Sequence, residues 1–137
     1  MSQTPAATRA GRCLCGAVRF RAEGAPKWVA HCHCESCRRQ TGAAFATYAG
    51  YPTAAVTWTQ GQPATYASSP GVTRHFCATC GTPLAYVGSR WPGEIHLFVP
   101  TFDVPAEFVP QAHVNTDEQL PWVHLADGLK RLARTTR

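Results

Sequence analysis

Hydrophobic and polar residues alternate with a period of two along much of the chain, a pattern typical of β-strands that bury one face. The clearest example is residues 18–22, Val-Arg-Phe-Arg-Ala, where apolar and charged side chains take turns. Further strands are predicted over residues 44–49, 55–59, 65–67, 72–76, 84–87 and 95–99. Clusters of Gly, Pro and Ser separate the strands at intervals of roughly 8–12 residues, which favours an antiparallel β-domain.

Helices are predicted to be few and short. One turn is expected over residues 36–40, stopped by Thr41-Gly42, and a second short helix is expected to begin at Pro105 and to run to Phe108. The apolar residues 120–123 are expected to return onto the core.

The chain shows no internal repeat and no linker, so we expect one domain, and 137 residues are enough to bury a core. Residues 11–129 are predicted to form this domain. The Ser/Thr/Ala-rich residues 1–10 are predicted to be disordered. Residues 130–137 hold four basic side chains and are predicted to be a solvated tail.

Charge and hydropathy narrow the class of protein. Thirteen basic and eight acidic residues give a formal charge of +5, and seven thiolates with two zinc ions would change this to +2 (+5 − 7 + 4). Basic and aromatic residues do not interleave as on a base-stacking surface, so nucleic-acid binding is not favoured. No signal peptide is visible in residues 1–12, and no segment approaches the roughly 20 apolar residues of a membrane span. We therefore predict a cytoplasmic protein whose thiols stay reduced.

The seven cysteines are the most informative residues of the chain. They form three groups: the N-terminal pair Cys13 and Cys15, the central trio Cys32, Cys34 and Cys37, and the C-terminal pair Cys77 and Cys80. Thiolates one or two residues apart reach a single Zn²⁺ ion without distorting the backbone. In the C-terminal pair, Gly81 is expected to take the left-handed conformation that closes a tight knuckle.

The count of cysteines predicts two unequal sites. A structural zinc site uses four protein ligands, whereas a reactive site uses three and keeps one position for water or substrate. Seven thiols make one site of each kind, with no thiol left over. All-sulfur ligation is also compatible with iron.

Spacing leaves two pairings open. A zinc-ribbon arrangement would join Cys34 and Cys37 to the C-terminal pair. The other joins the N-terminal pair to the C-terminal pair and leaves the central trio as a compact three-ligand face. We favour the second, because the trio closes only small loops while the two distant pairs staple the N-terminal strand to the middle of the chain.

Other interpretations of the cysteines compete with this one. Two closed structural sites result if His31 or His33 completes the second. A disulfide framework is improbable for an odd number of cysteines in a reducing compartment. A catalytic cysteine nucleophile is not favoured, because no cysteine stands apart from the clusters. A thioredoxin-like redox motif is not favoured either, because the βαβ context is missing. His75, His96, His113 and His124 are expected to be structural, and Trp28, Trp58 and Phe45 to be core or pocket wall.

Four blocks of residues, in order, resemble the glutathione-dependent formaldehyde-activating family (GFA, or CENP-V/GFA). The blocks are Gly11-x-Cys-x-Cys-Gly-Ala-Val-x-Phe20, His31-Cys-His-Cys-x-x-Cys-Arg-Arg-x-x-Gly-Ala43, Phe76-Cys-x-x-Cys-Gly-Thr-Pro-Leu84, and Pro121-Trp122 with Asp127-Gly-Leu129. The resemblance spans residues 11–129, and the formaldehyde-activating members are longer than this chain.

The resemblance implies a fold, a metal content and a reaction. The fold is a β-tent of small antiparallel sheets held by a structural zinc. By motif position, Cys13, Cys15, Cys77 and Cys80 would bind the structural zinc, and Cys32, Cys34 and Cys37 a second, catalytic zinc. The implied reaction is the addition of glutathione to formaldehyde, a carbon–sulfur lyase reaction in the synthetic direction.

Two arginines follow the central trio and are candidate anion-binding groups. Three thiolates on Zn²⁺ carry a net charge of −1, so an incoming thiolate needs compensation. Arg38 and Arg39 would supply it, or hold a carboxylate of glutathione in a bidentate contact. The alternative for both is a solvated surface pair. His31 and His33 are candidate neighbours of the ligands or proton carriers.

Overall fold

The computed structural model describes residues 7–135. The strands are β1 (Thr8–Arg12), β2 (Arg19–Glu23), β3 (Trp28–Cys32), β4 (Ala46–Pro52), β5 (Val56–Gln60), β6 (Ala64–Ser69), β7 (Val72–Phe76), β8 (Pro83–Gly88), β9 (Glu94–Phe98), β10 (Ala112–Val114) and β11 (Lys130–Leu132). The helices are α1 (Glu35–Thr41) and the short 3-10 turns η1 (Thr53–Ala55), η2 (Val99–Thr101), η3 (Pro105–Glu107) and η4 (Thr116–Glu118). The mainly β class predicted from the alternating pattern is confirmed.

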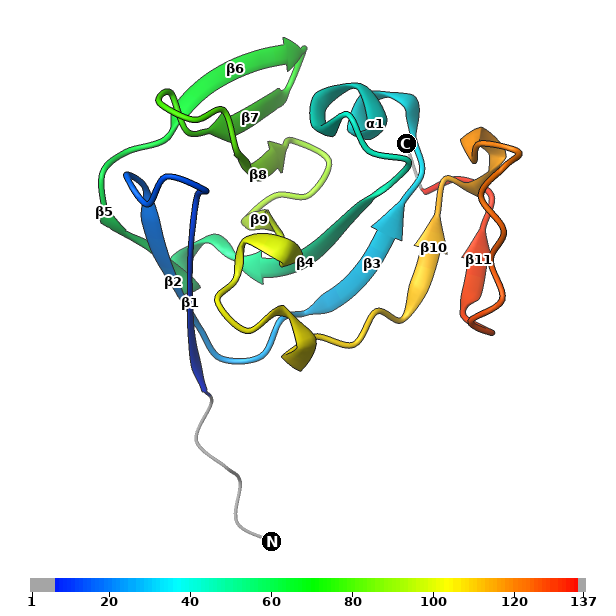
Figure 1. Cartoon of the computed structure of the whole chain (residues 1–137), viewed down its shortest axis with the longest axis horizontal. Coiled ribbons are helices and arrows are strands. Elements are labelled where there is room, and N and C mark those ends of the chain that lie inside the picture. Colours follow the sequence, from blue (N-terminus) through cyan, green and yellow to red (C-terminus); the bar gives the residue numbers. More distant parts are fainter. Residues whose placement is uncertain (1–6, 136–137) are drawn as a thin grey trace, which may run out of the picture.

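The strands form two sheets of unequal size. The smaller sheet has the order β1-β2-β5 and the larger has the order β11-β10-β3-β4-β9-β8-β7-β6. Neighbouring strands are antiparallel except at β10, which runs parallel to both β3 and β11. In Figure 1, β6 lies at one end of the molecule and β10 with β11 at the other. The antiparallel prediction therefore holds for all but this end of the larger sheet.

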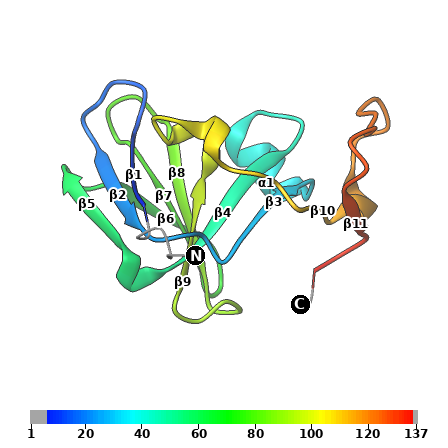
Figure 2. The same cartoon turned by 90° about the horizontal axis from the view of Figure 1, so that it is seen from below.

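The main core lies between the two sheets, which are inclined to each other in Figure 2. Phe20 of β2 meets the rings of Phe102 and Trp58 edge-on, with centroids 5.1 and 5.8 Å away. Leu84 and Leu97, from the larger sheet, are fully buried in the same cluster. This packing holds the smaller sheet against one face of the larger one.

The opposite face of the larger sheet carries a second apolar cluster. Successive side chains of a strand point to opposite faces, so Ala49 enters the main core while Tyr48 points away from it. Tyr48 packs on Phe98 with ring centroids 4.5 Å apart, and Cys37 of α1 belongs to the same cluster. We call this side of the sheet the α1 face.

Both predicted helices form, close to the expected positions. Cys34 caps the N-terminus of α1, where its Sγ accepts a bond from the backbone N–H of Cys37. Gly42 ends α1 with φ at +69°, and its N–H donates to the carbonyl of Arg38. The second short helix is η3, which begins at Pro105 as expected.

The predicted boundaries of the domain need correction at both ends. Residues 8–10, expected to be disordered, belong to β1, which pairs with β2 along its whole length. Residues 130–132, expected to lie in a solvated tail, form β11 beside β10. The side chains of both strands are mostly exposed, so neither strand shows a hydrophobic pattern in the sequence. Backbone hydrogen bonds to a neighbouring strand hold each of them in place. Residues 1–6 and 136–137 lie outside the described residues.

Residues 120–123 were expected to pack on the core, and the structure differs. Trp122 keeps 66% of its surface exposed. The segment closes a turn in which the N–H of Val123 donates to the carbonyl of Leu120, and this turn directs the indole outward. In the described part of the chain, no helix is long and apolar enough to cross a membrane.

Candidate metal centres

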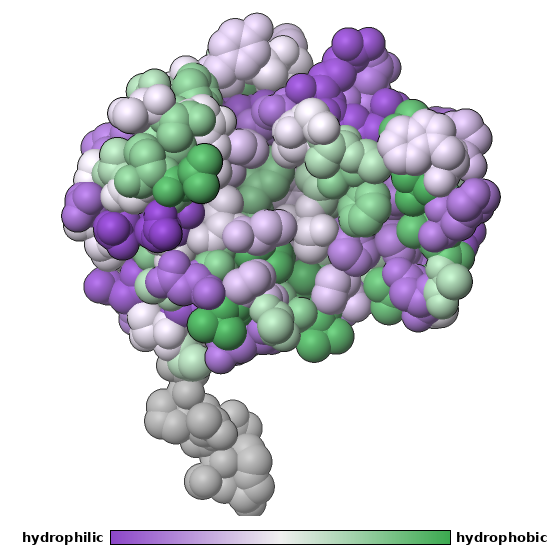
Figure 3. Space-filling model, viewed as in Figure 1, coloured by the Kyte–Doolittle hydropathy of each residue, from purple (hydrophilic) through white to green (hydrophobic). Residues whose placement is uncertain are grey.

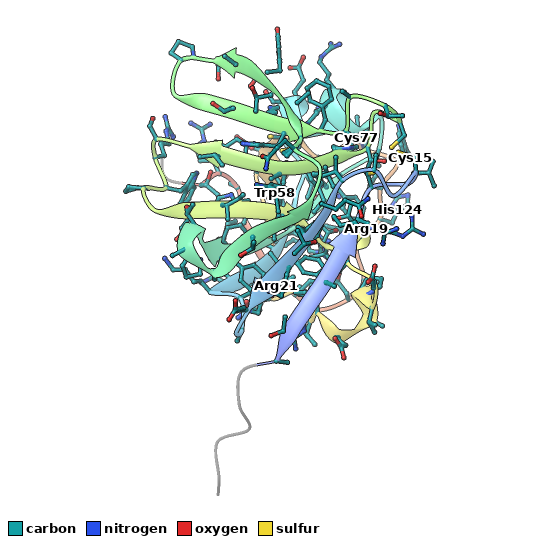
Figure 4. The ribbon with its side chains drawn as sticks, turned by 90° about the vertical axis from the view of Figure 1, so that its left-hand side faces the viewer. Cys15, Arg19, Arg21, Trp58, Cys77 and His124 are labelled. Atoms are coloured by element: carbon teal, nitrogen blue, oxygen red, sulfur yellow. The ribbon has the colours of Figure 1, made fainter. Side chains whose placement is uncertain are left out.

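Two turns bring four cysteines together at one end of the sheets. Cys13 and Cys15 lie in the turn between β1 and β2, and Cys77 and Cys80 lie between β7 and β8. Figure 4 shows Cys15 and Cys77 close to each other at the ends of their strands. The four sulfur atoms lie within 4.8 Å of one another, so we call these residues the four-thiol cluster. These are the cysteines that meet in the favoured pairing, which joins the N-terminal pair to the C-terminal pair.

Each pair sits in a turn that directs backbone N–H groups at sulfur. Val18 donates its N–H to the Sγ of Cys13 at 3.3 Å. Thr79 and Cys80 donate theirs to the Sγ of Cys77 at 3.3 and 3.4 Å. Gly81 has the expected positive φ of +82°, and its N–H closes the turn onto the carbonyl of Cys77. Donors arranged in this way stabilise thiolates, which are the form that binds a metal.

The spacing of the sulfurs fits a tetrahedral metal ion. Four sulfurs at ~2.3 Å from Zn²⁺ lie ~3.8 Å from each other in a regular tetrahedron. The Sγ atom of Cys15 lies 3.6 Å from that of Cys13 and 3.8 Å from that of Cys77. The two turns are also tied directly, because the N–H of Leu14 donates to Oγ1 of Thr82. The cluster therefore holds its sulfurs at zinc-binding distances.

The remaining three cysteines meet on the α1 face. Cys32 ends β3, Cys34 caps α1 and Cys37 lies in its first turn, with their sulfur atoms within 4.8 Å of one another. We call them the three-thiol cluster. Cys32 and Cys37 are buried. Within residues 7–135, no histidine, aspartate or glutamate joins this group as a fourth ligand atom.

Two polar side chains that sequence reasoning missed contact this cluster. The hydroxyl of Tyr48 lies 3.3 Å from the Sγ of Cys37, and Nδ2 of Asn115 donates to the Sγ of Cys32 at 3.3 Å. Both residues are buried. Asn115 has a φ of +58°, a left-handed conformation that asparagine tolerates better than most residues. No sequence signal marks either residue, because both reach the sulfurs through tertiary packing.

The thiols of this cluster compete for protons. Hydrogen bonds from Cys32 and Cys37 lower the pKa of Cys34, and the charge of Arg74 adds to the effect. The pKa of Cys37 is raised by the hydrogen bonds that this thiol forms with Cys32 and Cys34, and by its burial. One thiolate therefore forms readily while the last proton is held, and a bound cation would favour loss of all three protons.

The histidines beside the trio form a separate network. Nε2 of His33 lies 2.9 Å from Nδ1 of His113, whose Nε2 lies 2.8 Å from a carboxylate oxygen of Asp127. Burial lowers the pKa of His33 to about 4, so this ring is neutral near pH 7. Nδ1 of His31 lies 2.8 Å from the hydroxyl of Thr47. The ring of His31, on β3, stacks on that of His113, on β10, and the ring of His33, directly after β3, lies tilted against the same His113 ring. Neither His31 nor His33 joins the three-thiol cluster.

The two arginines after the trio form their hydrogen bonds with groups other than its sulfurs. Arg38 donates to the backbone carbonyls of His33 and Glu118. Arg39 is 78% exposed and pairs with Glu35 at 2.7 Å, one helical turn away. These contacts fit roles in holding α1 and its surface, and anion binding by Arg38 or Arg39 stays a prediction.

One hollow among the described residues is lined by none of the cysteines of the three-thiol cluster. It measures about 560 Å³ and lies between Leu14, the segment from Thr41 to Thr47, and residues 98–103, which include η2. Figure 3 shows that this face of the molecule is hollowed near its middle. A smaller pocket of about 280 Å³ is lined by Gln40 and Arg74 on the α1 face. Both hollows reach α1, the larger through Thr41 and the smaller through Gln40.

Comparisons with known proteins place the chain in a family. The family model described as glutathione-dependent formaldehyde-activating enzyme matches residues 8–118. A Halomonas elongata protein named "Putative glutathione-dependent formaldehyde-activating enzyme" is 30% identical over 124 residues, which cover 84% of this chain and 79% of that protein. A Schizosaccharomyces pombe protein named as an uncharacterized lyase is 33% identical over 84 residues, 60% of this chain and 61% of its own length.

A solved structure shares the fold. The crystal structure of a Rhodobacter sphaeroides protein superposes with a TM-score of 0.59 at 22% identity, over 90% of this chain and 98% of that one. At this identity the likeness shows the fold alone. The family is shown by the family model, whose match extends from β1 to η4 and spans all seven cysteines, and by the Halomonas relative. The chain belongs to the glutathione-dependent formaldehyde-activating (GFA) family.

Proposed function

We propose that this protein adds a thiol such as glutathione to a small aldehyde such as formaldehyde, with Zn²⁺ bound in both clusters. The observation that carries the proposal is the inequality of the clusters: one offers four thiols at tetrahedral spacing, and the other offers three with no fourth ligand atom among the described residues. A three-ligand site suits a reactive metal, and a four-ligand site suits a structural one. The names of the family and of the Halomonas relative support this choice of substrates.

The reaction balances without a redox partner. The thiol loses its proton, its sulfur lone pair forms a bond to the carbonyl carbon, and the π electrons of the carbonyl move to oxygen. The oxygen then takes a proton, so the product is an S-hydroxymethyl derivative of the thiol, which is a hemithioacetal. A zinc ion in the three-thiol cluster would supply the positive charge that lowers the pKa of the substrate thiol.

The residues of this chain hold and tune the site. Tyr48 and Asn115 direct an O–H and an N–H group at two of the three sulfurs, which favours their thiolate forms. Because α1 packs against the apolar side chains of its face, Cys37 is shielded from water. The backbone N–H of Cys37 donates to the Sγ of Cys34, so all three sulfurs have a donor from the chain.

The test combines metal analysis with calorimetry. The protein is loaded with zinc, the metal content per chain is measured, and glutathione is titrated into it. We expect two ions per chain and a binding heat that disappears when the more weakly held ion is removed by mild chelation. Formation of the hemithioacetal from glutathione and formaldehyde is then followed by NMR.

The competing function is a zinc-stabilised binding module without catalysis. Such a module would hold both ions alike, would lose them together with its fold, and would give no heat with glutathione. Zinc sites that behave in this way would refute the proposed reaction.

A further inference from the structure

Arg74 is a buried cation in the middle of β7. Only 7% of its surface is exposed. Nε donates to the hydroxyl of Ser68 at 3.1 Å, and Nη1 donates to Oε1 of Gln40 at 2.6 Å. The guanidinium also lies over the ring of Tyr86, 5.2 Å from its centroid. All of these partners are neutral, and among the described residues no carboxylate forms an ion pair with Arg74.

A buried charge without an opposite charge is unfavourable. Removing an ionised group from water weakens the folded state unless hydrogen bonds or an opposite charge compensate for the lost hydration. The ion-paired arginines of this structure, such as Arg9, Arg21 and Arg39, are more exposed and each has a glutamate partner. Arg74 is more buried than these arginines and has no carboxylate partner among the described residues. Its two hydrogen bonds leave Nη2 without a partner among residues 7–135.

Arg74 also lines a pocket beside α1, the helix that carries Cys37. This pocket, of about 280 Å³, lies between Gln40 of α1, Tyr66 of β6 and Gly81. Gln40 follows Cys37 by three residues, so the two side chains lie on the same side of α1. Gln40 is also the residue that accepts the 2.6 Å hydrogen bond from Nη1 of Arg74, so the guanidinium lies against the helix that carries Cys37. The pocket and Cys37 of the three-thiol cluster therefore share the same side of α1.

We infer that Arg74 and its pocket bind a carboxylate of the thiol substrate, which places that substrate's sulfur at the three-thiol cluster. A guanidinium matches a carboxylate in charge and in planar geometry. The substrate class is then a thiol that carries a carboxylate, as glutathione does on both of its ends. This inference rests on the proposed function, since it names the feature of the thiol that the site recognises.

The test uses a ligand that cannot react. S-methylglutathione keeps both carboxylates of glutathione but has no thiol, so its binding reports the carboxylate site alone. Calorimetry of the zinc-loaded protein is carried out with S-methylglutathione, with its diethyl ester, and with 2-mercaptoethanol, which has a thiol and no carboxylate. Metal content is measured for every variant.

Arg74→Gln should weaken S-methylglutathione binding about 10- to 100-fold, the usual effect of losing a charged hydrogen bond. The affinity of Arg74→Gln for 2-mercaptoethanol should stay within a factor of about two of the wild-type value, a smaller change than the loss of one weak hydrogen bond would cause. The matched control is Arg21→Gln, which removes an exposed arginine of the smaller sheet that is labelled in Figure 4 and should change neither affinity. The diethyl ester should bind the wild-type protein as weakly as S-methylglutathione binds Arg74→Gln, and this comparison needs no folded variant.

Several results would overturn the inference. One is equal binding of S-methylglutathione and its diethyl ester. Another is an Arg74→Gln variant that loses affinity for both ligands alike, since Arg74 would then serve the thiolates of the cluster. The two proposals fail separately: Arg74-dependent binding without hemithioacetal formation would refute the reaction alone, and condensation with an unchanged KM for glutathione in Arg74→Gln would refute the carboxylate site alone.

Discussion

Donors from the chain surround the sulfur atoms of both clusters. In the four-thiol cluster these donors are backbone N–H groups of the same turn as the cysteine, as at Cys13 and Cys77. In the three-thiol cluster two of the donors are side chains from other strands and loops, Tyr48 and Asn115. The first arrangement is local and the second depends on tertiary packing. Substitution of one side chain should therefore alter the three-thiol cluster without touching the other.

Tyr48→Phe should weaken metal binding at the three-thiol cluster. Loss of the hydroxyl removes the hydrogen bond to Cys37 while the buried ring keeps its packing on Phe98. Losing a partner of a metal ligand typically costs about 10- to 100-fold in metal affinity. Competition with a chromophoric chelator measures the affinity of each ion, and only the weaker should change. Tyr66→Phe, at an exposed ring, is the control, and equal affinities in wild type and Tyr48→Phe would exclude a role for this bond.

At the scale of elements, the short helix α1 connects the thiols to the sheet. It has seven residues, too few to be stable alone, so its ends must be held. Cys34 caps one end with its sulfur, and Gly42 caps the other in a left-handed conformation. Its side chains contact β4 through Cys37 and β7 through Gln40. Conditions that loosen α1 should therefore loosen the three-thiol cluster.

Gly42→Ala should destabilise the protein by about 1 kcal/mol, the usual cost of a side chain in the left-handed region. An added Cβ meets no atom within 4 Å, so conformation alone causes the loss. Urea unfolding of the zinc-loaded protein measures the change in free energy. Gly42→Asn should lose less, because asparagine tolerates this conformation. Equal stability of Gly42→Ala and wild type would show that the cap contributes nothing.

At the scale of the whole molecule, the two clusters differ in how far apart in sequence their cysteines lie. The four-thiol cluster links turns separated by 62 residues between Cys15 and Cys77, and so ties the smaller sheet to the larger one. The three-thiol cluster lies within one short segment at the end of β3 and the start of α1. Loss of metal from the first should therefore affect the entire fold, and loss from the second should not.

Cys77→Ser should unfold the domain, whereas Cys32→Ser should lose one metal ion and keep its β-structure. The reason is that metal binding between distant segments contributes directly to folding. Far-UV circular dichroism and metal analysis of both purified variants measure the two effects. If both variants unfold to the same extent, or both stay folded, the two clusters do not divide structural and reactive roles as proposed.

Much of the fold could be read from local patterns. Strand β7 has the predicted bounds, and β2, β5 and β9 are within one residue of theirs, because their alternation reports the face that each buries. Strands β1 and β11 could not be found in this way, since hydrogen bonds to a neighbour hold them and their side chains are mostly exposed. The parallel pairing of β10 with β3 depends on the path of a long connection, which periodicity does not encode.

The sequence by itself determined the ligand types, their local spacing and the family. Two thiols one or two residues apart share a turn in almost any fold, so the N-terminal pair, the central trio and the C-terminal pair are local properties of the chain. Only the tertiary structure decided which groups meet, and it brought Asn115 to Cys32 across 83 residues and Gln40 to Arg74 across 34. Such contacts depend on the order and register of strands in the sheets, because one step of register moves a side chain to the opposite face.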